Sequence, residues 1–76
     1  MQHLFLHVRD GEAFIEDPEG GNFPDIAAAH AEAIASLQEI VADRLEAGAK
    51  PGRLQVEICD DGGHLLAVIS SKAVLH

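Results

Sequence analysis

The chain has 76 residues, room for a single domain (1–76) with one core, and 13 acidic residues against 5 Lys and Arg give a formal net charge of −8. This balance argues against nucleic acid and anionic membranes as partners, because both attract proteins through clustered basic side chains. The lone cysteine, Cys59, excludes an internal disulfide. The sequence contains no apolar run long enough to span a bilayer, and it does not start with the basic and then apolar segments of a signal peptide. We therefore expect a cytoplasmic protein.

The first part of the chain predicts two strands and a loop. Residues 2–9 alternate between apolar and polar side chains, the pattern of a half-buried strand. Its core-facing side chains would be Leu4, Leu6 and Val8. The Asp10-Gly11 pair predicts a turn, so Glu12–Glu16 becomes a short return strand. Asp17–Asn22 is dense in turn-forming residues and predicts a loop.

A long helix is predicted next, over Ile26–Ala47. Asp25 supplies an N-terminal cap, and Gly48 is a natural stop. At 100° per residue, one apolar stripe gathers the side chains Ile26, Ala33, Ile34, Leu37, Ile40, Val41 and Leu45. An acidic ridge lies opposite, formed by Glu32, Glu39, Asp43 and Glu46.

The last part of the chain predicts a β-hairpin. Residues 53–59 alternate again, and the core-facing side chains would be Leu54, Val56 and Ile58. Asp60–Gly63 has the composition of a hairpin turn. The final strand, His64–Ser70, is apolar on both faces.

These elements predict an α+β fold, β-β-α-β-β, in which one long helix packs on one face of a four-stranded antiparallel sheet. A helix of this length spans about 33 Å and a strand about 23 Å, so the helix can return the chain to the far end of the sheet. Strand order 2-1-3-4 follows. This order leaves the doubly apolar last strand at an edge, a liability that proteins normally cover. The alternative order 2-1-4-3 buries that strand but makes the first and last strands parallel.

Three segments resemble a known family of short bacterial proteins. They are Phe5-Leu6-His7-Val8-Arg9-Asp10-Gly11, the stretch from Phe23-Pro24-Asp25 to Ala33, and the hairpin Val56-Glu57-Ile58-Cys59-Asp60-Asp61-Gly62-Gly63. The family they resemble is domain of unknown function 6894. The resemblance covers nearly the whole chain and implies a fold but no activity. Members often carry an aromatic pair where this chain has Leu4-Phe5, and Arg where it has His30.

The five histidines do not predict a metal site. His3 and His7 lie four apart on one strand face, about 13 Å from each other, so they cannot chelate one ion together. His7 and Cys59 could meet across neighbouring strands, but two ligands fall short of the four of a structural zinc site. His30 falls in the helix's apolar stripe. We interpret it as a ring at the edge of the core whose polar end contacts water. The alternative is a pH-sensitive group in a pocket.

The remaining candidates favour structure over chemistry. The acidic residues between Asp10 and Asp25 match no calcium loop, and Gly20-Gly21 and Gly62-Gly63 match no phosphate loop. Cys59 has no arranged base and is expected to be an inert thiol. We therefore expect no catalytic residue, no cofactor and no enzyme activity.

Two functions remain open. The first is a homodimeric protein-interaction module whose acidic surface also suits a basic protein partner. Its interface residues would be Phe5, Leu66, Val68, Ala28, Ala35 and Ala42. The three alanines repeat every seven residues, which fits helix-to-helix packing or simply high helix propensity. The second is a small-molecule or metal-binding sensor that uses the sheet face around His3, Phe5, His7 and Cys59.

Overall fold

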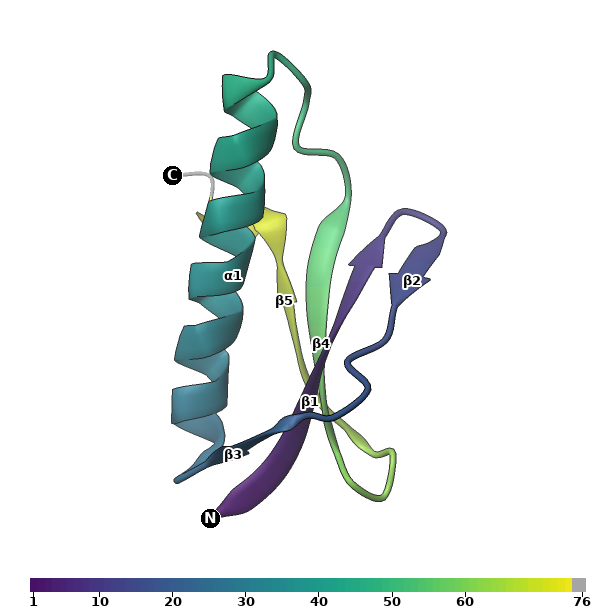
Figure 1. Ribbon diagram of the computed structural model, residues 1–76, viewed down its shortest axis with the longest axis vertical. Helices are drawn as coiled ribbons and strands as arrows, with labels where there is room; N and C mark the ends of the chain where they lie inside the picture. Colours follow the sequence, from purple (N-terminus) through teal and green to yellow (C-terminus); the bar gives the residue numbers. More distant parts are fainter. Residues whose placement is uncertain (75–76) are drawn as a thin grey trace.

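The computed structural model describes residues 1–74 and places one helix against a single antiparallel sheet (Figure 1). The elements are β1 (Gln2–Asp10), β2 (Ala13–Ile15), β3 (Gly21–Phe23), α1 (Ile26–Glu46), β4 (Leu54–Asp60), β5 (Leu65–Ser70) and the short 3-10 helix η1 (Ser71–Val74). All strand pairs are antiparallel and follow the order β2-β1-β4-β5. The predicted fold class and strand order are confirmed.

The sheet contains a fifth strand that the sequence did not indicate. This strand, β3, consists of Gly21–Phe23, which are the last two residues of the predicted loop and the residue after it. It pairs with the first residues of β1. The return strand β2 is only three residues long and pairs with the last residues of β1. A three-residue strand with a glycine has too little alternation to be recognised. It forms because the nine-residue β1 leaves a long free edge beyond β2.

The core lies between α1 and the sheet. Leu4 from β1 and Val56 and Ile58 from β4 are almost completely buried, and they face Ala33 and Leu37 of the helix. In the register, Leu6 lies opposite Ile58 and Val8 opposite Val56, so the alternation predicted for both strands is confirmed.

The ends of the predicted helical stripe lie outside this core. Ile26 is 40% exposed and Leu45 56% exposed, although both were expected to be buried. A 21-residue helix is about 32 Å long, whereas the seven-residue β4 spans only about 23 Å. The two ends of the helix therefore extend past the strands that would cover them.

The buried row of the helix also takes a different path. The buried residues are Ala29, Ala33, Leu37 and Val41, one every four positions. Each step of four advances about 40° around the helix, so the contact line winds as the helix crosses a twisted sheet. A straight stripe missed Ala29 and included His30. The ring of His30 lies about 100° off the contact line and is exposed, not at the core edge.

Two polar contacts fix the ends of the helix. Asp25 caps the N-terminus as predicted, because its Oδ1 accepts a hydrogen bond from the Ala28 N–H at 2.9 Å. Near the C-terminus, Arg44 donates to Asp10 Oδ2 at 2.6 Å and to the Pro51 carbonyl at 2.6 Å. Arg44 thereby joins the helix, the end of β1 and the loop before β4. Its hydrogen bond holds the pKa of Asp10 below the usual value.

None of the helices within residues 1–74 combines the length and the apolarity that a membrane crossing requires.

Candidate functional site

The face of the sheet opposite α1 is not covered by a helix (Figure 1). A row of rings runs along this face. We call it the open face; its side chains are His3, Phe5, His7, Arg9, Phe14, Gln55, Glu57, Cys59 and Val68. The ring centroids of His3 and Phe5 are 5.0 Å apart, edge to face. Those of Phe5 and His7 are 6.1 Å apart and nearly parallel, and those of His7 and Phe14 are 5.3 Å apart. The row is continuous from β1 to β2.

A guanidinium group ends this row. Arg9 Cζ lies 4.7 Å from the centre of the Phe14 ring, and Arg9 Nε donates to Glu57 Oε2 at 2.7 Å. Gln55 donates to the same oxygen at 3.0 Å. The hydrogen bond from Arg9 lowers the pKa of Glu57. The protein thus builds one aromatic–guanidinium–carboxylate arrangement from its own residues.

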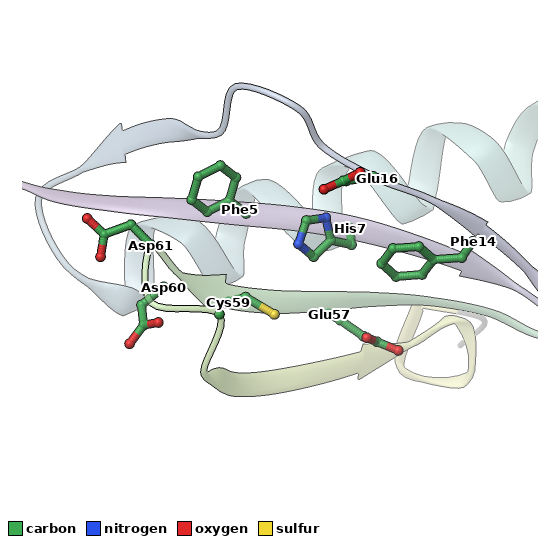
Figure 2. A pocket seen from close by; sticks show the side chains of 9 residues that line it. Phe5, His7, Phe14, Glu16, Glu57, Cys59, Asp60 and Asp61 are labelled. Atoms are coloured by element: carbon green, nitrogen blue, oxygen red, sulfur yellow. The ribbon is translucent and has the colours of Figure 1, made fainter.

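Between β1 and β4 the open face is hollowed, with a volume of about 400 Å³ (Figure 2). We call this the open-face hollow; it is lined by Phe5, His7, Phe14, Glu16, Glu57, Cys59, Asp60, Asp61 and Gly63. Figure 2 shows Phe5 and His7 rising from β1, Cys59 and Glu57 from β4, and Phe14 at one end with Asp60 and Asp61 at the other. Aromatic rings form one wall, and carboxylates stand at the rim.

The loop from Asp17 to Gly20 holds the edge of this hollow. The Asp17 N–H donates to His7 Nδ1 at 3.0 Å, so in the neutral ring the hydrogen is on Nε2. Asp17 Oδ2 accepts from the Leu6 N–H at 3.2 Å, and Oδ1 accepts from the Gly20 N–H at 3.1 Å. Leu6 lies in the gap between the segments of β1 that pair with β2 and β3. One carboxylate therefore takes the place of the missing strand partner.

Both ring nitrogens of His3 face oxygen atoms. Nδ1 is 2.9 Å from Asn22 Oδ1, and Nε2 is 2.8 Å from the Glu19 carbonyl. A charged imidazolium satisfies both acceptors, whereas a neutral ring satisfies one. The pKa of His3 is accordingly raised, first by Asn22 and then by Glu19.

The surroundings of Cys59 favour the protonated thiol over the thiolate. It is buried opposite Phe5 in the β1–β4 register. Burial raises its pKa, and the neighbouring carboxylates of Glu57 and Asp60 add to the rise. A thiolate is the reactive and metal-binding form. Among residues 1–74, no three His, Cys, Asp or Glu side chains are grouped to hold a metal ion.

The β4–β5 turn is organised by one carboxylate at the end of the hollow. Asp60 Oδ1 accepts from the N–H groups of Gly62 at 3.0 Å and His64 at 2.8 Å. The backbone bond from His64 is the main reason why the pKa of Asp60 is lowered. Asp61, the next residue, is exposed at the turn.

The last strand, β5, forms an exposed apolar edge. Leu65 is 57% exposed, Leu66 47% and Val68 49%. The register against β4 shifts after Ile58, which leaves Leu66 as an extra residue on β5. No strand within residues 1–74 pairs with the outer side of β5.

Comparison with known proteins gives a family. Residues 3–71 match the family described as Domain of unknown function (DUF6894). The chain belongs to the DUF6894 family. The resemblance noted in the sequence is thereby confirmed, and the match covers the long helix and every strand except the first residue of β1. No curated protein and no solved structure matches the sequence.

The residues expected at an interface lie on different surfaces of this DUF6894 member. Phe5 and Val68 share the open face, and Leu66 is exposed beside them on β5. The alanines belong to α1 on the other side of the sheet (Figure 1). There Ala35 and Ala42 are exposed, and Ala28 is half-buried.

The residues expected at a sensor face are partly brought together. Phe5, His7 and Cys59 line the open-face hollow, whereas His3 is held away from it by Asn22 and Glu19. Sequence reasoning missed Phe14, which the register places opposite Arg9. The Asp10-Gly11 turn was the available signal, since a tight turn fixes which residues of the return strand face β1.

Proposed function

We propose that the protein is a non-enzymatic, cytoplasmic protein-interaction module that acts as a homodimer, with the β5 strands of two copies paired antiparallel about a two-fold axis. One observation carries the proposal: β5 is an edge strand with no charged residue and with three large side chains about half exposed. Native proteins normally protect such an edge with charges, proline, short strands or a covering element.

The opposite edge of the sheet is protected in that manner. It consists of two three-residue strands, β2 and β3, and the Asp17 carboxylate occupies the gap between them. A second chain could not form a long ladder there. The six-residue β5 is longer than either of them, although it carries the extra residue Leu66, and an antiparallel pair of identical strands is self-complementary about a two-fold axis.

For a second copy, charge favours this edge over the other surfaces of the molecule. With a net charge of −8, two copies repel each other over most of their surfaces. The outer face of α1 carries exposed Glu32, Glu39 and Asp43, which would oppose each other across a helix-to-helix dimer. The β5 edge brings no acidic side chain to the seam. It also joins the open faces of two copies into one continuous surface.

A charge placed at the seam tests the proposal. Val68→Lys should convert a dimer to a monomer in sedimentation velocity, because each copy would place a charged side chain on the apolar strand that forms the seam. Leu45→Lys is the matched control, since Leu45 is also about half exposed but lies on the helix. Far-UV circular dichroism verifies that both variants fold. If folded Val68→Lys has the same mass as the wild type, the β5 dimer is wrong.

The absence of enzyme activity is part of the same proposal. Two features support it: the Cys59 thiol is buried with a raised pKa, and His7 Nδ1 is engaged by the Asp17 N–H. Neither group is available as a nucleophile or a general base.

A ligand-binding role for the open face is the second candidate. The hollow between Phe5, His7 and Cys59 favours it. Because that wall is aromatic and the thiol has a raised pKa, an organic group suits the hollow better than a metal ion.

A further inference from the structure

The open-face hollow combines two features that recognise the same chemistry. Its aromatic wall contains Phe5, His7 and Phe14, and four carboxylates line it, from Glu16, Glu57, Asp60 and Asp61. Aromatic faces attract cations through their quadrupole, and carboxylates attract them through charge. Within the described part of the chain, no Lys or Arg lines the hollow.

The carboxylates differ in how far they are already used. Glu57 is paired with Arg9, and Asp60 accepts hydrogen bonds from its own turn. Glu16 and Asp61 are exposed and take part in none of the ion pairs found within residues 1–74. These two remain available for an external positive group at the rim.

Arg9 shows what kind of group this surface accommodates. Its guanidinium lies 4.7 Å above Phe14 and donates to a carboxylate at 2.7 Å. Farther along the row, Phe5 and His7 present aromatic rings of the same kind, and no Lys or Arg of the described chain lines the hollow beside them. The two rings are 6.1 Å apart, less than the roughly 7 Å that a planar group stacked between them would require. An incoming guanidinium would therefore lie over the row.

We infer that the open-face hollow binds an arginine side chain from an extended, basic segment of a protein partner, with the guanidinium over Phe5 and His7 and its N–H groups directed to Glu16, while Asp61 adds negative charge at the other end of the hollow. Guanidinium suits the site better than ammonium because it is planar, stacks on rings and bonds to carboxylates with several donors. The inference rests on the proposed role as an interaction module and adds the chemistry of its partner. It does not require the β5 dimer.

A peptide titration of the full-length chain tests this inference. The probe is a short capped peptide of alternating arginine and valine, titrated at low ionic strength and followed by amide shifts in ¹H–¹⁵N spectra. The control peptide replaces each arginine with citrulline, which keeps the shape and removes the charge. We expect the arginine peptide to shift the amides of Phe5, Cys59 and Gly63, and the citrulline peptide to shift none of them.

Matched variants distinguish specific binding in the hollow from non-specific attraction of the peptide to an acidic protein. Asp61→Asn and Glu16→Gln, both at exposed positions, and Phe5→Leu should each weaken binding by about two- to five-fold. Glu39→Gln removes the same charge from the far face of the helix and should leave the dissociation constant unchanged. Equal weakening by Glu39→Gln and Asp61→Asn, equal binding of the citrulline peptide, or no shift at millimolar peptide would each overturn the inference.

The same samples distinguish this inference from the dimer proposal. Phe5, Glu16 and Asp61 lie outside β5, so their substitution should not change the solution mass. If the protein is a monomer and binds the peptide, only the dimer proposal is refuted. If it is a dimer and does not bind the peptide, only the arginine site is refuted.

Discussion

The Asp17 N–H donates a hydrogen bond of 3.0 Å to His7 Nδ1, and the Asp17 carboxylate accepts from the neighbouring Leu6 N–H at 3.2 Å. One loop residue thereby fixes both a ring of the open face and the backbone of β1 between two short strands. The geometry of the aromatic wall depends on this loop.

Asp17→Ala should lower the free energy of unfolding by about 1–2 kcal/mol in urea denaturation, since it removes the acceptor of two backbone N–H groups. Glu12→Ala, in the exposed turn after β1, is the control and should change it by less than about 0.5 kcal/mol. Equal effects of the two substitutions would contradict the role of Asp17.

Gly20 should tolerate no side chain. Its φ is +67°, and an added Cβ would lie 2.8 Å from the Leu4 carbonyl oxygen and 3.0 Å from the Phe5 ring. Gly20→Ala should lower the free energy of unfolding by about 3 kcal/mol, from backbone strain and steric overlap together. Gly11 has a similar φ of +60° but open space around it, so Gly11→Ala should lose only about 1 kcal/mol. Similar losses for both variants would show that the loop does not pack against β1 as described.

The winding contact row of α1 gives a third test. Ala33 is completely buried against the sheet, whereas Ala35 is exposed. Ala33→Leu should lower stability by about 1–3 kcal/mol through overpacking, and Ala35→Leu should have little effect. Thermal or urea unfolding measures both. A destabilised Ala35→Leu beside a neutral Ala33→Leu would place the helix in a different rotation.

Acid stability should depend on Asp10. Because Arg44 lowers the pKa of this carboxyl in the folded state, its contribution is complete above the unfolded value of 3.8 and is lost as the pH falls through the lower folded value. Asp10→Asn should therefore flatten the decline of stability below about pH 4. Asp43→Asn, on the outer helix face, should leave that decline unchanged. If the stability of Asp10→Asn declines below about pH 4 as steeply as that of the wild type, the pairing with Arg44 is contradicted.

Much of this architecture follows from sequence periodicity. The alternation in β1 and β4 predicts their core residues because each strand has one buried face, and the length of α1 predicts the strand order. The short β3 and the role of Asp17 were not predictable, because side-chain-to-backbone bonds leave no periodic signal. The exposure of His30 was missed because a straight helical stripe ignores the twist of the sheet.

The candidate site was predictable only in part. The pairing of strands brings His7 and Cys59 to one face, as expected from their alternation. The carboxylates at the rim come from turns, Glu16 before the Asp17 loop and Asp61 in the β4–β5 turn. Their position relative to the rings depends on the path of each turn in space, which residue spacing does not determine.

The central claim is that β5 forms the seam of a homodimer, and the most direct test is the solution mass of the wild-type chain. Light scattering over a concentration series, at low and at high salt, should give twice the mass of one chain, with the dimer strengthened by salt because screening weakens the repulsion between two acidic copies. A mass equal to one chain at the highest concentrations, at both low and high salt, would contradict the account.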